Sequence, residues 1–541
     1  MFILSVVISA YASATATAYV VNVTNQTEFD SLGERLISLL DTGVKRINVV
    51  FAQGIYFFHE DHLNLKDIEV PDAEISFEGN GSVLMAEGGA YCNGDIFTDD
   101  ITPTESIVTT EGLDLNMWSK MLRTSNYLME VVDEANLICR LNASDLGNLT
   151  DRNEEECRWM YIWIPQWYYS GAYKVKKIES GYIYFTSSVN DLNYDHSYGK
   201  ITQLRFRLCN NPDERGDVLI TGGHIYLPND VKEVRHTKVS RFLNSYNSSF
   251  NSLSFNGLKF YGNGKPNNNV ESPDMSKQLL DFRYTKCEKI KIEKCEFRAL
   301  QTTAINMTST NNAFIEDCQF EDCYSYCVHQ DRSSRVCDVH ACTFHNVNKR
   351  ITFSNTICCS GSDFHIYDNT ISDFGYVGIA VGIRHGHADK KCNCNGVVER
   401  NELFYTQPYF EAVEDHNLMD SGAIYLYTIS NSTTIRYNYI HHYGGVCDNR
   451  GIFCDDGAMN FQIYGNTITN LTNSYSIDSR RVASLDSKLG AVNVNNVIRD
   501  NIVDRPIRFQ GNEKKNNGCI FEGNIHLDGN YADDKISNVN Q

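Results

Sequence analysis

The second half of the chain repeats one short pattern of apolar and polar positions. Each copy has an apolar residue, two variable residues, a Cys or an Asn, one variable residue and a second apolar residue. An apolar residue followed by a bend and another apolar residue predicts two strands joined by a sharp turn. The copies lie at residues 292–297, 315–320, 339–344, 366–371, 398–403, 435–440, 463–468, 498–503 and 521–526, with a degenerate first copy at 255–260.

The spacing of the copies predicts the fold class. Successive copies begin as few as 23 residues apart (315 − 292 = 23). A period in the low twenties with β-branched residues at the apolar positions indicates coils of strands that stack on one another. A leucine-rich repeat has a similar period, but its Leu-x-x-Leu-x-Leu pattern is absent. The sequence therefore predicts an all-β protein, a right-handed single-stranded parallel β-helix.

The Cys or Asn of each copy predicts an inner ladder. Stacked coils place equivalent residues about 4.8 Å apart. Asn tolerates left-handed backbone at a bend, and its amide can hydrogen-bond the matching turns above and below. We expect small-residue rungs followed by amide rungs. The rungs are Cys295, Cys318, Cys342, Asn369, Asn401, Asn438, Asn466, Asn501 and Asn524.

Other patterns divide the chain into four regions. Residues 27–41 have helical apolar spacing and predict a helix that caps the open end of the solenoid. Residues 75–84 resemble a first coil. The repeat then disappears between about 101 and 238, where residues 175–185 alternate like an antiparallel hairpin. We predict a signal peptide at 1–18, the cap and first coils at 19–100, an inserted β-rich subdomain at 101–238, and the main solenoid at 239–541.

The N-terminus adds a cellular location to this picture. Residues 2–12 are mostly apolar, and small residues follow up to Ala18, which predicts a secretory signal peptide and a secreted protein. No later stretch has the run of about 20 apolar residues that a membrane span requires. Nine Asn-x-Ser/Thr triplets agree with a secreted glycoprotein. They start at Asn22, Asn25, Asn80, Asn142, Asn148, Asn247, Asn306, Asn431 and Asn470.

Cysteine usage and charge narrow the chemistry further. Eighteen Cys in an oxidising compartment predict some disulfides, whereas the ladder cysteines should stay buried thiols. A formal net charge of −20 without a basic block argues against binding of nucleic acid and against capture by anionic membranes, and weighs mildly against polyanionic glycans. The cysteines expected to form bridges, in or near loops, are Cys358, Cys359, Cys392, Cys394, Cys447 and Cys454.

Two adjacent coils carry parallel phrases at residues 420–427 and 450–457. Both strands precede their repeat copy by eleven residues (435 − 424 = 11 and 463 − 452 = 11), so Ile424 should stack over Ile452. Alternation then points Tyr425, Tyr427, Phe453 and Asp455 outward on one face. Asp420 stands at the entry of its strand, and Asp456 follows the exit of the other.

These residues favour a saccharide cleft. One carboxyl group can protonate the leaving oxygen while another activates water or attacks the anomeric carbon. The alternative is structural: Asp-Asp-Gly after a strand is also an ordinary turn, and Asp420 can simply begin a loop. Sequence pattern alone leaves both readings open.

A resemblance bears on this choice. The chain resembles the pectin-lyase-like superfamily, and more narrowly β-helical glycoside hydrolases of the fucosidase/xylanase and β-xylosidase type. The similarity covers the cap, the insert ending at Gly223 to Pro228, and the solenoid, with site phrases at 420–425 and 451–457. It implies that Asp420 together with Asp455 or Asp456 acts as acid and as nucleophile or base.

Several further residues are candidates for contacting a sugar. His385, His387, His416 and His442 follow or precede the strands of this region, alongside the outward aromatics. His385 and His387 lie near Cys392 and Cys394, but a loop disulfide suits a secreted chain better than zinc. We therefore predict no bound metal and no cofactor.

The leading hypothesis is a glycosidase acting on a carbohydrate substrate. The alternatives are a polysaccharide lyase or uronate epimerase, for which the Arg and Lys needed as a base are sparse at 420–457, and a non-catalytic glycan-binding protein.

Overall fold

The computed structural model describes most of the solenoid and parts of the insert. The described residues are 18–58, 61–86, 96–98, 128–141, 159–164, 169–186, 203–208, 218–221, 224–226, 241–263, 278–300, 302–323, 325–348, 355–382, 394–406, 421–427, 430–444, 449–455, 458–472, 475–479, 495–509 and 519–527.

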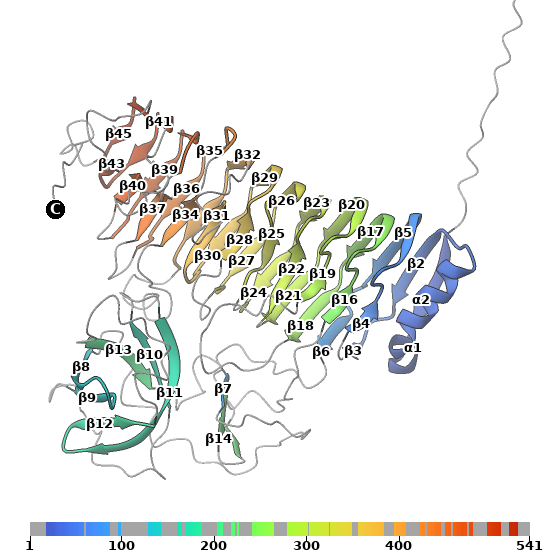
Figure 1. Ribbon diagram of the computed structural model, residues 1–541, viewed down its shortest axis with the longest axis horizontal. Coiled ribbons are helices and arrows are strands. Elements are labelled where there is room, and N and C mark those ends of the chain that lie inside the picture. Colours follow the sequence, from blue (N-terminus) through green and yellow to red (C-terminus); the bar gives the residue numbers. More distant parts are fainter. Residues whose placement is uncertain are drawn as a thin grey trace, which may run out of the picture.

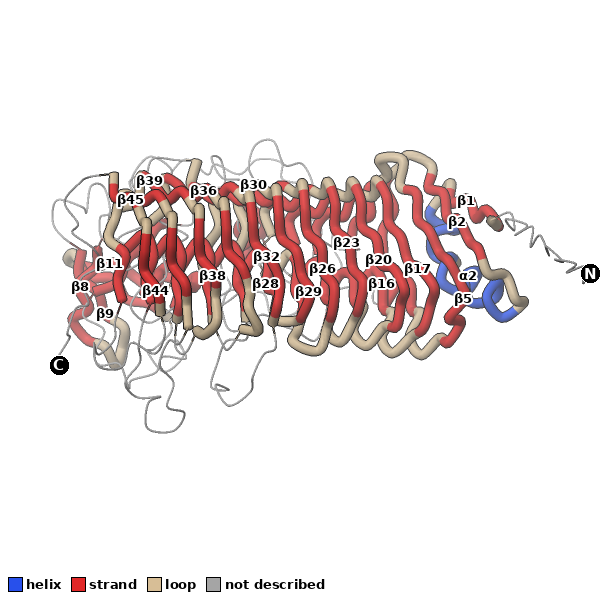
Figure 2. Tube along the Cα trace, turned by 90° about the horizontal axis from the view of Figure 1, so that it is seen from above, coloured by secondary structure: helices blue, strands red, loops and turns tan. Residues whose placement is uncertain are grey.

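Three long parallel sheets wind into one solenoid, which confirms the predicted parallel β-helix (Figure 1). Sheet A has 13 strands that lie side by side in Figure 2. They are β1 (Tyr19–Val23), β2 (Arg46–Phe51), β5 (Glu69–Glu78), β17 (Ser249–Asn256), β20 (Lys286–Glu293), β23 (Asn311–Glu316), β26 (Arg335–His340), β29 (Ser362–Tyr367), β32 (Asn395–Glu399), β35 (Thr434–Arg436), β38 (Gln462–Tyr464), β41 (Val497–Arg499) and β44 (Ile520–Glu522).

Each coil continues from sheet A into sheet B and then into sheet C. Sheet B has 12 strands: β3 (Ile55–Phe58), β6 (Val83–Ala86), β18 (Lys259–Asn263), β21 (Glu296–Leu300), β24 (Gln319–Glu321), β27 (Thr343–His345), β30 (Thr370–Ser372), β33 (Glu402–Phe404), β36 (Tyr439–His441), β39 (Thr467–Thr469), β42 (Ile502–Val503) and β45 (Ile525–His526). Sheet C has 11: β4 (Asp61–Asn64), β16 (Arg241–Asn244), β19 (Gln278–Asp281), β22 (Thr303–Met307), β25 (Val328–Gln330), β28 (Asn355–Cys359), β31 (Val377–Val381), β34 (Gly422–Leu426), β37 (Arg450–Cys454), β40 (Tyr475–Ser479) and β43 (Ile507–Phe509).

The repeated phrase is the bend between sheets A and B. In the copy at 292–297, Ile292 faces the core near the end of β20, Cys295 is the rung, and Phe297 begins the inner row of β21. The expectation that the rung itself takes left-handed backbone is wrong. The preceding residue does so instead, as with Lys294 (φ 52°), Asp368 (φ 54°) and Arg400 (φ 54°). This leaves the rung side chain pointing inward.

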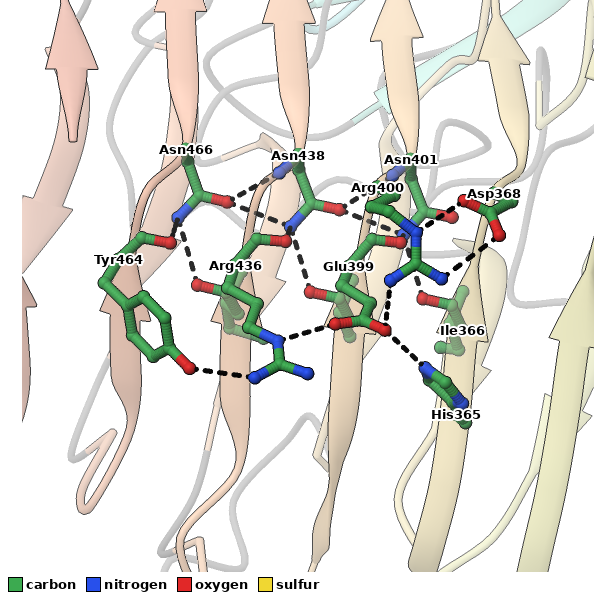
Figure 3. Close-up of polar contacts among 12 residues, drawn as sticks. His365, Ile366, Asp368, Glu399, Arg400, Asn401, Arg436, Asn438, Tyr464 and Asn466 are labelled. Carbon is green, nitrogen blue, oxygen red and sulfur yellow. Dashed lines mark hydrogen bonds and ion pairs between the residues drawn. The ribbon is translucent and has the colours of Figure 1, made fainter. Parts of the chain in front are cut away.

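The Asn rungs form the predicted amide ladder (Figure 3). The Nδ2 of Asn438 donates to Oδ1 of Asn466 at 3.0 Å and to the carbonyl of Val398 at 3.0 Å. Its own Oδ1 accepts from the backbone N–H of Asn401 at 3.1 Å. Each amide thereby satisfies buried backbone groups of both neighbouring coils, which is the requirement for burying a polar side chain.

The Cys rungs pack in the same position but bond more weakly. Sγ of Cys318 contacts the carbonyl of Ile292 at 3.5 Å, and burial raises the pKa of the Cys295 and Cys342 thiols. The predicted bridges at Cys358, Cys359, Cys394 and Cys454 are wrong, because all four carry thiols that are buried within described strands or beside them. Cys392 and Cys447 lie outside the described residues.

Stacked side chains fill the core. The rings of Phe297, Phe320 and Phe344 lie 4.6 Å apart in succession, nearly parallel. This spacing matches the separation of neighbouring strands. At the N-terminal end, α1 (Gln26–Asp30) and α2 (Leu32–Asp41) form the predicted helical cap, with Phe29, Leu32 and Leu36 buried.

The insert interrupts one coil and leaves the stacking intact. Strand β16 pairs directly with β4, so that Leu243 lies opposite Leu63. Within the insert, Val175 pairs with Phe185 in the predicted antiparallel hairpin. A closed barrel contains β8 (Leu128–Asp133), β9 (Ile138–Leu141), β10 (Trp159–Ile164), β11 (Tyr169–Glu179), β12 (Tyr182–Phe185) and β13 (Gln203–Leu208). A small sheet contains β7 (Ile96–Thr98), β14 (Val218–Thr221) and β15 (His224–Tyr226). The barrel lies beside the C-terminal half of the solenoid, on the side of β34 and β37 (Figure 1).

Candidate functional site

The predicted site strands are neighbours in sheet C. Strands β34 and β37 pair in parallel, with Ile424 opposite Ile452, and Tyr425 opposite Phe453. This confirms the predicted register. Ile424 and Ile452 belong to the core, whereas Tyr425 and Phe453 belong to a separate apolar cluster outside it.

That outer cluster covers four coils of sheet C, from β28 to β37. Its rings pack closely: Tyr425 and Phe453 meet edge to face at 5.2 Å, and Tyr376 lies 6.3 Å from Tyr425. Phe453 is fully buried. A fully buried ring offers no surface to a sugar, so the structure gives Phe453 a packing role. The members of the outer cluster are Cys358, Tyr376, Val377, Ala380, Tyr425, Tyr427 and Phe453.

Asp455 extends this cluster at the end of β37. The hydroxyl of Tyr425, one coil earlier, donates a hydrogen bond to Oδ2 of Asp455. The backbone N–H of Asp455 donates to the carbonyl of Leu426 at 2.9 Å, which fixes where the side chain leaves the chain. No described residue hydrogen-bonds to Oδ1. One carboxylate oxygen is therefore held by a described side chain, and the other is not.

A buried ion cluster lies on the next coil. Asp478 of β40 pairs with Phe453 across the sheet. Nε of Arg450 donates to its Oδ2 at 3.0 Å, and Nε of Arg508 donates to its Oδ1 at 2.8 Å. The Arg450 guanidinium also lies 4.2 Å from the centre of the Phe453 ring. These contacts fix the orientation of both arginines around Asp478.

Sequence reasoning missed Asp478 and Arg508. The spacing of eleven residues between a sheet C strand and the next repeat copy does not hold for this coil, because Ile477 precedes Ile498 by 21 residues (498 − 477 = 21). A second signal was present in the sheet C strands themselves. Six of them have a small residue, then Ile, then an outward residue: 303–307, 355–359, 377–381, 422–426, 450–454 and 475–479.

Only part of the predicted site can be placed. Asp420, Asp456, His385, His387 and His416 lie outside the described residues. The neighbour of Asp420, Ser421, stands before β34 and hydrogen-bonds to Asn449 at 2.8 Å, whereas Asp455 follows the other end of the paired strand. A five-residue strand spans about 17 Å, so Ser421 and Asp455 lie about that far apart along the paired strands.

His442 lies away from Asp455. It follows β36 of sheet B, at the turn that leads toward sheet C, and its side chain is exposed. Its Nδ1 lies 2.7 Å from Nδ1 of His441. The structure therefore brings Tyr425, Tyr427, Phe453 and Asp455 together but does not add His442 to them.

Among the described residues, no group of three or more His, Cys, Asp or Glu side chains converges in a way that could hold a metal ion. Within the same residues, no helix has the length and apolar character of a membrane span.

Comparison with known families agrees with the topology. The family model of the right-handed beta helix region matches residues 303–481. The chain is a right-handed parallel β-helix protein. The matched segment of this β-helix protein contains the ladder from Cys318 to Asn466, the strands β34 and β37, and Asp455.

Solved structures share the fold at low identity. A structure described as a glycoside hydrolase superposes with a TM-score of 0.53, covers 94% of this chain and 97% of its own, and is 12% identical. No curated protein sequence matches the chain.

Two further structures match less closely. The Gp54 tailspike of Acinetobacter baumannii bacteriophage AP22, in complex with A. baumannii capsular saccharide, has a TM-score of 0.17, 10% identity, and coverage of 90% of this chain and 76% of its own. XylC in complex with xylose has a TM-score of 0.28, 9% identity, and coverage of 88% and 64%.

Proposed function

We propose that this β-helix protein is a secreted glycoside hydrolase that cleaves a poly- or oligosaccharide, with Asp455 as its nucleophile or general base. The observation that carries the proposal is the carboxylate of Asp455, which has one oxygen held by the Tyr425 hydroxyl and the other left without a described donor. A nucleophilic or basic carboxylate needs a fixed orientation and one accessible lone pair. The full-length superposition on a glycoside hydrolase supports the same reaction class.

The reaction needs a second carboxyl group as the acid. Asp456, adjacent in sequence to Asp455, is the first candidate for protonating the leaving oxygen. Asp420 is the weaker candidate, because its neighbour Ser421 lies a strand length from Asp455, about 17 Å, whereas glycosidase carboxyl groups lie roughly 5–9.5 Å apart. Asp478 suits this role poorly, because it is fully buried and both of its oxygens accept hydrogen bonds from arginine. We assign Asp478 a positioning role instead: through Arg450 it holds β37, the strand that Asp455 follows.

Matched substitutions test the proposal. Asp455→Asn removes the nucleophile while keeping the shape, so kcat/KM on the best of a panel of aryl glycosides and polysaccharides should fall by about 10²–10⁴-fold. Tyr425→Phe removes one hydrogen bond to the carboxylate and should lower kcat by about tenfold. Asp420→Asn and Asp456→Asn identify the acid. Asp317→Asn, at an exposed left-handed turn, is the control and should change nothing.

The outcomes separate the competing functions. Full hydrolysis by Asp455→Asn protein with unchanged circular dichroism would refute the assigned role. Absorbance from unsaturated uronates would indicate a lyase. Retained glycan binding without turnover in the wild type, unchanged in all these variants, would indicate a binding protein.

A further inference from the structure

A pair of adjacent histidines, His441 and His442, lies at the end of β36. The residue that follows a sheet B strand takes left-handed backbone in several coils: Asp322 (φ 53°), Asn346 (φ 58°), Asp373 (φ 51°), His442 (φ 48°) and Asn470 (φ 58°). Asn, Asp and His are the non-glycine residues most enriched in this conformation. His442 is the histidine of this series, and its ring lies beside that of His441.

The first histidine of the pair is held in one tautomer. Nε2 of His441 lies 3.1 Å from Oε1 of Glu402, one coil earlier. Because a carboxylate only accepts, Nε2 carries the proton and donates it. The neutral ring therefore has its lone pair on Nδ1. Phe404 and Tyr439 stack on the ring at 4.8 and 4.2 Å and fix its plane.

The second histidine lies against the first. The Nδ1 atoms of His441 and His442 lie 2.7 Å apart, with ring planes at 86°. In the metal-free protein, Nδ1–H of His442 can donate to His441. His442 is exposed, so its proton can move to Nε2 through water and leave one lone pair on each of the two neighbouring Nδ1 atoms.

We propose that His441 and His442 form a two-nitrogen site for a divalent copper ion, with water in the remaining positions. Metal–imidazole bonds of about 2.0 Å and the observed separation give an angle of about 85° at the metal, that of neighbouring ligands in a square plane. Tetrahedral zinc would require the nitrogens about 3.3 Å apart. Cu²⁺ also binds nitrogen sites most tightly among the divalent first-row ions. Glu402 fixes the orientation of His441 as an outer carboxylate does at known sites.

The test uses the full chain without a polyhistidine tag, titrated with CuCl₂ in a glycine-containing buffer. The wild type should bind one Cu²⁺ in preference to Zn²⁺, with an axial electron paramagnetic resonance spectrum and splitting from two imidazole nitrogens. His442→Asn keeps a residue that suits the left-handed backbone, and it should abolish this signal, as should His441→Asn. Glu402→Gln should weaken binding by about 10–100-fold.

The control is His345→Asn, which removes another sheet B histidine that pairs with Asp373. It should bind Cu²⁺ as the wild type does. The proposal fails if His442→Asn protein binds the ion with unchanged stoichiometry and spectrum, or if the wild type does not compete with glycine. A site with equal preference for Zn²⁺ would contradict the square-planar geometry.

Discussion

The outward faces of sheets A and C carry similar residue types in opposite surroundings. On sheet A, the Glu399 carboxylate accepts from two arginines and a histidine whose side chains are 35%, 46% and 35% exposed (Figure 3). On sheet C, Asp478 also accepts from two arginines, but it is 0% exposed and its partner Arg450 only 1%. Both carboxylates are buried, but the partners of Glu399 are partly solvated, whereas Arg450 is buried together with Asp478.

This difference points to the face with function. Solvated ion pairs contribute little and are common on any surface. A buried cluster must overcome the desolvation of every charge in it, and apolar residues of the same size would often be as stable. Charges are thus harder to explain by stability on sheet C than on sheet A. Asp478 lies one coil from Asp455, on the side of the solenoid beside which the barrel lies (Figure 1).

The largest expected effect comes from neutralising the buried carboxylate. Asp478→Asn keeps the shape but leaves Arg450 buried beside a neutral amide. We expect the free energy of unfolding to fall by about 3–5 kcal/mol, the usual cost of breaking a buried pair from one side. Urea denaturation followed by circular dichroism measures it. A loss below about 1 kcal/mol would mean that sheet C is as solvated as sheet A.

A middle effect comes from the inner ladder that both faces share. Asn438→Ala removes the acceptor of the Asn401 N–H and the donor to the Val398 carbonyl, both buried. Unsatisfied buried groups of this kind should lower the free energy of unfolding by about 2–3 kcal/mol. Cys318→Ala, at an equivalent rung, should cost less, because its thiol makes only weak contacts at 3.3 and 3.5 Å. Equal losses would show that the amides act as fillers only.

The ladder also shows how far sequence reasoning reaches. The period and the Cys or Asn position predicted the stacking, because every coil must repeat the same bend and any residue facing inward must suit the residues above and below it. The residue with left-handed backbone was misplaced by one position, since Lys294, Arg400 and Tyr437 all adopt it and none is a residue type that signals this conformation.

The site was less predictable than the fold. Alternation along β34 and β37 put Tyr425 and Asp455 on one face, because strand geometry fixes which face a residue occupies. The link from Asp478 to Arg508 depends on how coils of unequal loop length come into register, and no period in the sequence carries that information. Burial of Phe453 depends on what packs over the sheet, which alternation does not encode.

The smallest expected effect is the matched substitution on sheet A. Burial acts to raise the pKa of Glu399, but hydrogen bonds from Arg436, Arg400 and His365 outweigh it and hold the pKa below its usual range. A carboxyl with a lowered pKa in the folded state stabilises the protein above its unfolded pKa, near 4.5, and loses that contribution as pH falls through the folded value. Because the partners are solvated, Glu399→Gln should lower the free energy of unfolding at pH 7 by about 1 kcal/mol or less, and less still in 1 M salt. The gap between wild type and variant should close as urea denaturation is repeated at decreasing pH below 4.5. A gap that persists at the lowest pH would show that Glu399 acts through packing and not through its charge.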